Sequence, residues 1–281
     1  METSAFLSLT DYVEKLAENF GTYKRAFPHS FSCAEQLDEL FWELYTSQVV
    51  PDKEIIWQPV AHSMLFGCIT SWCHAFATCA SGLDEHALTS TRRSIEFACY
   101  IAKICNSEER AGLWITRRDD EASRKRFTLE FGIPQAYFSA KYTHLKRLLV
   151  IHDHASEFAT HANLAMLAQK FKESGSTMVP LVFDDPRDIP LNAGSILQLG
   201  SLLIQATVAD LAALMQDRDK FLIRFSAFQT ALSHAKTEIL AHEQRAGIEP
   251  EIVKAINAIP TLIDDKFEQM KKDSERRGRP Q

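Results

Sequence analysis

The stretch PVAHSMLFGCITSWCHAFATCAS-GL-DEHALTSTRRSIEFACYIAKIC, residues 59–105, decides the fold. It consists of two apolar segments that are joined only by Gly82 and Leu83, and each is long enough for a helix of about six turns. Gly82 is a natural C-terminal cap, because glycine adopts a positive φ without a steric penalty. A connection this short makes consecutive helices antiparallel neighbours. We therefore predict a central antiparallel helix hairpin formed by residues 59–81 and 84–105.

Helical signals continue on both sides of this predicted hairpin. Capping boxes that begin at Ser8 and Ser32 open two further helices. Gly and Pro number only 10 each in 281 residues, which favours long helices with few connections. The run MVPLVF at 178–183 is the one strand-like stretch, and we expect a small irregular or hairpin insertion near 176–190. The predicted fold class is all-α, a helical bundle around the central hairpin.

The composition is that of an ordinary soluble globular protein, with 46% hydrophobic and 24% charged residues. We predict a single helical domain over residues 1–270, followed by a polar, basic and frayed tail over residues 271–281. The formal charge of −6 argues against a dedicated nucleic-acid binder. The most apolar long stretch, 193–215, contains two glutamines and Asp210, so we predict a buried helix there and no membrane span.

Cysteine usage predicts the compartment. Five of the six cysteines lie in apolar helical stretches, and no C-x-x-C pair occurs. Buried, reduced thiols are typical of a cytoplasmic protein. Charged residues interrupt the first 20 residues, so these do not form the apolar core of an export signal. We expect a cytoplasmic protein with no membrane partner, no metal and no cofactor.

One charge stands out inside the second apolar segment. Glu96 is the only charged residue between Arg93 and Lys103. A carboxylate in such surroundings is costly to bury unless it is paired or protonated. Arg92 and Arg93 precede Glu96 by four and three residues, so on a helix either guanidinium can reach it. The sequence therefore predicts a polar cluster in which Glu96 is largely buried and pairs with one of these arginines.

The segment TRRSIEF at 91–97 resembles part of an uncharacterised bacterial all-helical family that is known only as a domain of unknown function. The family pattern is an Arg-Ser-x-x-Glu element, then a Tyr, then a Ser-Glu-x-x-x-His element. The chain matches the first element with one residue fewer between Arg93 and Glu96, and the others with Tyr142 and with SEFATH at 156–161. The resemblance implies a polar pocket where Arg93, Glu96, Tyr142 and His161 meet, and no known activity.

A second group of candidate residues follows Arg147. His154, Glu157 and His161 lie at i, i+3 and i+7, so on a helix they share one face and could bind a metal or share a proton. One helix supplies at most part of a metal site, so we favour histidines at the margin of a helix.

Arg147 is also followed by His152 and His154 with the spacings Arg-x4-His and Arg-x6-His. These spacings resemble the pattern of the HEPN (higher eukaryotes and prokaryotes nucleotide-binding) helical superfamily, whose ribonuclease members act at a dimer interface. Leu148 departs from the polar residue that is common after the arginine in active members. The resemblance implies a homodimeric, metal-independent ribonuclease of a defence or toxin–antitoxin system, and here alone nucleic acid is an expected partner.

A third line of polar residues, His234, Glu238 and His242, has the spacing i, i+4 and i+8. His234 and Glu238 point away from the apolar face of the same helix, so we predict that this line is solvated. The predicted buried face of that helix consists of Phe221, Phe225, Phe228, Leu232, Ala235 and Ile239.

Three hypotheses for function stay open at the level of the sequence. The first is a soluble interaction or sensing protein with a buried polar pocket, the second is the HEPN-like ribonuclease, and the third is a metal-dependent enzyme. The sequence has no Gly-rich phosphate loop, no G-x-S-x-G and no H-E-x-x-H motif. Their absence argues against nucleotide chemistry on a P-loop or Rossmann unit.

Overall fold

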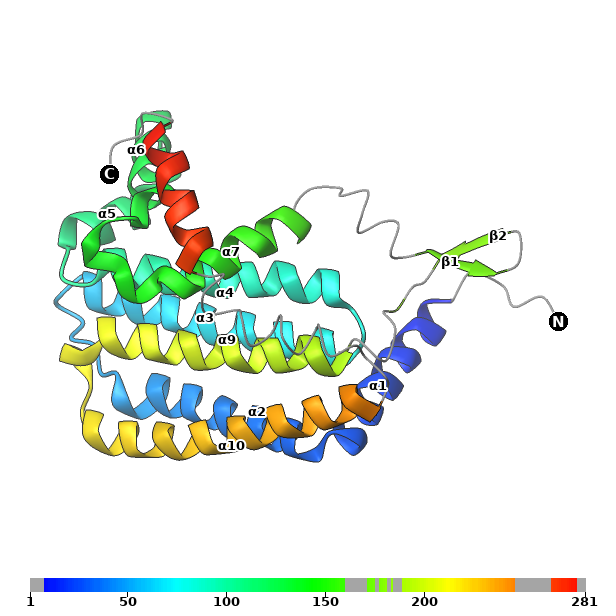
Figure 1. Ribbon diagram of the computed structural model, residues 1–281. Coiled ribbons are helices and arrows are strands. Elements are labelled where there is room, and N and C mark those ends of the chain that lie inside the picture. Colours follow the sequence, from blue (N-terminus) through cyan, green and yellow to red (C-terminus); the bar gives the residue numbers. More distant parts are fainter. Residues whose placement is uncertain are drawn as a thin grey trace.

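The computed structural model describes residues 8–159, 171–174, 177–180, 183, 189–245 and 264–276. The predicted all-α fold class is confirmed, with one small β-hairpin beside the helices. At the centre, α3 (Trp57–Ala80) and α4 (Asp84–Ile104) pack against each other along their length (Figure 1). Their apolar faces are buried between the other helices, and α4 contributes residues to both polar clusters described below.

Gly82 ends α3 as the sequence predicts. Its φ is 80°, its N–H donates to the carbonyl of Cys79 (2.8 Å), and the N–H of Leu83 donates to the carbonyl of Thr78 (3.0 Å). These are the two hydrogen bonds of a Schellman cap. The chain then enters α4 at once, and Asp84 and Glu85 supply negative charge to the first turn of that helix.

The remaining long helices surround this pair (Figure 1). Helix α9 (Ile189–Asp210) packs on both α3 and α4, and α7 (Lys146–Ala159) packs on α4. On the other side of α9, α2 (Pro28–Glu43) pairs with α10 (Arg218–Arg245), and α1 (Leu9–Ala26) contacts α2 and α3. The core between these layers contains the fully buried side chains of Leu37, Phe41, Leu65, Trp72, Ile95, Phe221 and Phe228.

Short helices build the end of the molecule at which α4 finishes. The charged stretch that follows α4 forms α5 (Glu108–Thr116) and α6 (Glu121–Phe131). Two 3-10 helices, η2 (Gln135–Tyr137) and η3 (Ala140–Leu145), then lead into α7. Elsewhere, the π-helix η1 (Leu44–Gln48) continues α2, and the 3-10 helix η4 (Ala212–Leu214) follows α9.

The β-hairpin begins earlier than the sequence predicts. Strands β1 (Phe171–Ser174) and β2 (Thr177–Pro180) are antiparallel, with Phe171 opposite Pro180 and Ser174 opposite Thr177. The insertion expected near 176–190 therefore starts at 171. The reason is that β1 has the polar sequence FKES, so the apolar signal covers β2 alone. The hairpin lies beyond the end of the bundle, near α1 (Figure 1).

Helix α2 begins at Pro28, so the capping box expected at Ser32 does not form. Proline is favoured at the first helical position, where its missing N–H leaves no donor unpaired. Phe27 provides no side-chain cap, and the carboxylate of Glu238 on α10 accepts from the N–H groups of Ser30 (2.9 Å) and His29 (3.3 Å) instead. The prediction that Glu238 belongs to a solvated line is therefore wrong, because the residue caps a neighbouring helix.

The apolar helix α9 is a core helix. By length and composition it could cross a membrane, but 61% of its most apolar window is buried inside the molecule. Within that core, the indole Nε1 of Trp72 donates to the carbonyl of Ile196 on α9 (3.0 Å). The predicted buried face of α10 is confirmed, since all six of its residues are buried. A last helix covers 264–276 and crosses residue 271, where the sequence predicts the start of the tail.

Candidate functional site

A polar cluster joins α4 to α7, and we call Arg92, Glu96, His152 and Ser156 the α4–α7 cluster. Arg92 Nε donates to Glu96 Oε1 (2.9 Å), and His152 Nε2 lies 3.4 Å from the same oxygen. Ser156 Oγ lies 3.5 Å from His152 Nδ1. A carboxylate only accepts, so this arrangement requires a proton on Nε2 and leaves Nδ1 of the neutral ring to accept from Ser156.

The sequence spacing on both helices produces this cluster. Arg92 and Glu96 are four residues apart on α4, and His152 and Ser156 are four residues apart on α7, so each pair occupies one face of its helix. The surrounding contact is apolar, with Leu148, Leu149 and Ala155 of α7 buried. Of the two arginines that the sequence predicts as partners of Glu96, Arg92 is therefore the one that pairs with it.

Burial across the cluster is graded. The side chain of His152 is 6% exposed, that of Glu96 is 25% exposed and that of Arg92 is 34% exposed. Glu96 is thus half-buried, and less buried than predicted, because the cluster lies at the margin of the α4–α7 contact. Burial raises the pKa of the Glu96 carboxyl, but the hydrogen bond from His152 and the charge of Arg92 outweigh burial and lower that pKa below its ordinary value.

A second polar cluster lies further along α4, and we call it the Lys103 cluster. Lys103 is seven residues beyond Glu96, which is about 10 Å along a helix. Lys103 Nζ lies 3.4 Å from Glu130 Oε1, and Arg110 Nε donates to the same oxygen (2.6 Å). The Nζ atom also lies 5.0 Å and 5.1 Å from the ring centroids of Tyr137 and Tyr142, so one ammonium faces two aromatic rings.

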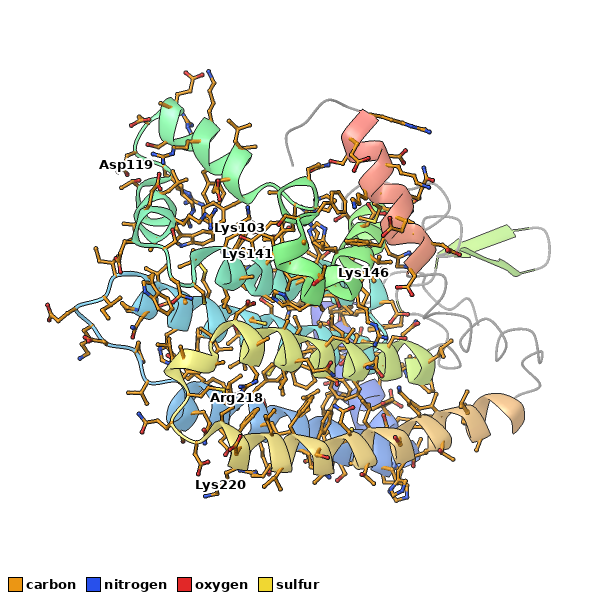
Figure 2. All side chains as sticks on the ribbon, turned by 60° about the vertical axis from the view of Figure 1, so that its left-hand side comes forward. Lys103, Asp119, Lys141, Lys146, Arg218 and Lys220 are labelled. Carbon is orange, nitrogen blue, oxygen red and sulfur yellow. The ribbon has the colours of Figure 1, made fainter. Side chains whose placement is uncertain are left out.

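Charge and burial compete in the Lys103 cluster. Burial lowers the pKa of the Lys103 ammonium, and the charge of Glu130 opposes this effect. Lys141 adds a further positive charge nearby, and Figure 2 shows it close to Lys103. The hydroxyl of Tyr137 is buried and has no hydrogen-bond partner in the part of the chain that the structure describes. This cluster is therefore less completely paired than the α4–α7 cluster.

The pocket implied by the family resemblance does not form from the described residues. Tyr142 belongs to the Lys103 cluster, and Lys103 lies about 10 Å along α4 from Glu96. Arg93 is exposed, and its guanidinium carbon lies 5.8 Å from the ring centroid of Phe97 on the side of α4 that meets α3. The remaining expected member, His161, lies outside the described residues. Glu96 instead meets Arg92 and His152.

The outer face of α7 carries the other sequence candidates. Arg147, His154 and Glu157 are all exposed, whereas His152 is buried against α4. Arg147 and His154 are seven residues apart, so they share one face, but Arg147 and His152 do not. No group of three His, Cys, Asp or Glu side chains placed to hold a metal ion occurs among the described residues, and His161, the third expected ligand, is not one of them.

Of the Lys103 cluster, the sequence predicts only Tyr142 as a site residue, and Lys103, Arg110, Glu130 and Tyr137 are not predicted. Lys103 carries the same signal as Glu96, a lone charge inside an apolar helix, so it could have been found. Comparison with family models, curated proteins and solved structures gives no match to this chain. The resemblances based on short motifs therefore remain predictions, and the functional argument rests on the geometry of these clusters.

Proposed function

We propose that this protein is a soluble interaction or sensing protein in which the α4–α7 cluster is the responsive element. One observation supports it above all: the buried imidazole of His152 contacts, across a helix–helix contact, the carboxylate that Arg92 already holds. Histidine is the side chain whose ordinary titration falls between pH 5 and 8. Gain of a positive charge on His152 beside Glu96 strengthens the attraction between α7 and α4, and loss of that charge weakens it.

Helix α7 suits a responsive role because polar contacts hold it on two sides. Towards α4 it makes the α4–α7 cluster. Towards the helix at 264–276 it makes the ion pairs Lys146–Asp264 (2.7 Å) and Asp153–Lys266 (3.3 Å). Small shifts of a helix at such contacts are a common form of conformational switching. A ligand or a change in charge causes such a shift only if it stabilises one of the two helix positions more than the other.

The test is hydrogen exchange in peptides from α7, measured at pH 6 and pH 8 and corrected for intrinsic exchange rates. We expect stronger protection of α7 at the lower pH, because a positive charge gained on His152 attracts the carboxylate of Glu96. His152→Gln should remove this pH response, whereas His154→Gln, which changes an exposed histidine on the same helix, should keep it. A wild-type protein without the response, or a His152→Gln protein that retains it, would contradict the proposal.

The cysteines support a cytoplasmic location within the same proposal. All six are thiols outside disulfides, and five of them are buried. Reducing compartments keep thiols in this state, and secreted proteins commonly pair theirs.

A second candidate function, the HEPN-like ribonuclease, is favoured by one observation. Arg147 and His154 are both exposed and lie on the same face of α7, so a second copy of the chain could meet them at a dimer interface. The test is cleavage of RNA in the presence of EDTA. Arg147→Ala and His154→Ala should each abolish cleavage, and Glu157→Gln should not. Absence of cleavage by the wild-type protein would exclude this candidate.

A further inference from the structure

A surface groove of about 480 Å³ lies between α3 and α4, apart from both polar clusters. Its walls include His74 and Phe66 from α3 and Ser90, Arg93 and Phe97 from α4. The volume falls in the range typical of small-molecule sites, about 300–1,000 Å³. The groove is therefore large enough for a compact organic ligand.

The charge of the groove is positive. Arg93 lines it, and no Asp or Glu is among the lining residues. Arg93 is exposed and makes no ion pair with a described carboxylate, whereas its neighbour Arg92 is bound to Glu96. A guanidinium presents donors in a planar fork that matches a carboxylate or a phosphate. The contact between His74 Nδ1 on α3 and Ser90 Oγ on α4 (2.9 Å) joins the two walls of the groove and fixes the imidazole.

The groove also has flat apolar walls. Phe66 is 44% exposed, and its ring contacts those of Trp42 (6.0 Å between centroids) and Tyr45 (5.6 Å). Phe97 provides a second ring, whose centroid lies 5.8 Å from the Arg93 guanidinium carbon. Aromatic rings favour offset-stacked or edge-to-face contacts with other rings. The groove therefore combines one available cation with two rings that are already in position.

We propose that this groove binds a small organic anion that carries a flat aromatic ring. Arg93 binds the carboxylate or phosphate of the ligand in a bidentate manner, and the ligand's ring packs against Phe66 and Phe97. This site is independent of the proposed sensing role, because it uses Arg93 and neither Arg92, Glu96 nor His152.

The test is isothermal titration of the full chain with two ring-bearing anions, adenosine 5′-monophosphate and indole-3-carboxylate. Adenosine and indole serve as neutral counterparts, and inorganic phosphate serves as an anion without a ring. At least one ring-bearing anion should bind. Its neutral counterpart and inorganic phosphate should each bind about tenfold more weakly or worse, because the charge-assisted contact and the ring contact each contribute about tenfold to the affinity.

Variants locate the binding site. Arg93→Gln and Phe66→Ala should each weaken binding of the ring-bearing anion about tenfold. Arg92→Gln, the matched change at the next residue, should leave binding within about twofold of the wild-type value, a margin below 0.5 kcal/mol. Arg93 and Phe66 are exposed, so their variants should keep the wild-type circular dichroism. Failure of both ring-bearing anions to bind, phosphate binding as tightly as either, or equal loss in Arg92→Gln and Arg93→Gln would overturn the proposal. None of these results bears on the exchange of α7.

Discussion

The Glu96 carboxylate receives both Arg92 and His152 on a single oxygen, Oε1. Exposed ion pairs on a helix contribute only about 0.3–0.5 kcal/mol, and breaking a fully buried pair costs about 3–5 kcal/mol. The side chains of Glu96 and Arg92 are 25% and 34% exposed, so the contribution of this pair to stability lies between these two limits. His152 is nearly buried, so its N–H needs an acceptor, and a neutral amide oxygen accepts this hydrogen bond more weakly than the carboxylate does.

Replacing Glu96 with Gln should lower the free energy of unfolding by about 1–3 kcal/mol at pH 7. The pKa of Glu96 is lowered in the folded state from the ordinary 4.5, so the stability that its charge provides is complete above about pH 4.5 and is lost as the pH falls through the folded pKa. Urea denaturation of wild type and Glu96→Gln should therefore differ at pH 7 and converge in acid. Glu157→Gln, at an exposed site on α7, is the control, and an unchanged midpoint for Glu96→Gln at pH 7 would show that the pair is not stabilising.

A substitution at Tyr137 tests whether its buried hydroxyl lowers the stability of the protein. Its side chain is fully buried, and its hydroxyl has no partner among the described residues. Leaving a buried hydroxyl unpaired costs about 1–3 kcal/mol, so Tyr137→Phe should be neutral or should raise the free energy of unfolding. Tyr142→Phe removes a hydroxyl that lies near the positive charge of Arg110, and it should lower the free energy of unfolding. Thermal denaturation of both variants distinguishes them, and a clear loss in Tyr137→Phe would mean that the hydroxyl has a partner.

Single residues also show what the sequence could predict of the site. Glu96 was recognisable because a lone charge in an apolar helix needs a partner, and Arg92 was recognisable because helical spacing puts it within reach. His152 lies 56 residues from Glu96, and Glu130 lies 27 residues from Lys103. No local spacing rule relates residues so far apart, so these partners depend on how α7 and α6 pack on α4. The groove at Arg93 depends on packing between α3 and α4 in the same way.

At the scale of elements, the close approach of neighbouring helices limits the size of the side chains on α9. A Cβ atom on Gly200 would lie 2.4 Å from Leu37 Cδ2 of α2 and 2.6 Å from Trp72 Nε1 of α3. Leu37 could move, but Trp72 is held by its hydrogen bond to Ile196. The glycine therefore allows α9 to lie against two neighbouring helices at once.

Gly200→Ala should lower the free energy of unfolding by about 1–3 kcal/mol, the usual cost of overpacking a core. The matched control is Gly112→Ala in α5, where an added Cβ meets no atom within 4 Å. Alanine is the better helix former, so the control should raise stability by about 0.5–1 kcal/mol. Opposite shifts in thermal midpoint are expected, and a Gly200→Ala protein as stable as wild type would show that α9 can move away from α2 and α3.

Helix ends were predictable where the cap is local. Ser8 caps α1 through Asp11, and Gly82 caps α3, as their sequence neighbours indicate. The start of α2 was not predicted, because its acceptor is Glu238, which is 208 residues from Ser30 in the chain. A cap that another helix supplies depends on how the helices pack, so it cannot be predicted from the sequence near the end of the capped helix.

On the scale of the whole molecule, the reactivity of the cysteine thiols measures how readily the central helices open. Four lie on α3 or α4, Cys105 follows the end of α4, and Cys33 lies on α2. Five are buried, and Cys73 is partly exposed. Burial raises the pKa of the thiols of Cys33, Cys73 and Cys105 to about 12, and it raises the pKa of Cys68 and Cys99 as well. At pH 8 a thiol with such a pKa is ionised in about one molecule in ten thousand, so reaction requires that the structure opens.

Native protein mixed with a disulfide reagent at pH 8 should therefore show no rapidly reacting thiol, and Cys73 should react before the others. All six should react at once in denaturant. If α2, α3 and α4 unfold as one cooperative unit, the five buried thiols share one opening rate, and Gly200→Ala should accelerate all five by the same factor. Mass spectrometry of labelled peptides resolves the sites. Labelling of Cys68 and Cys79 well ahead of Cys33 would contradict this prediction, because α3 would then open while α2 remains folded.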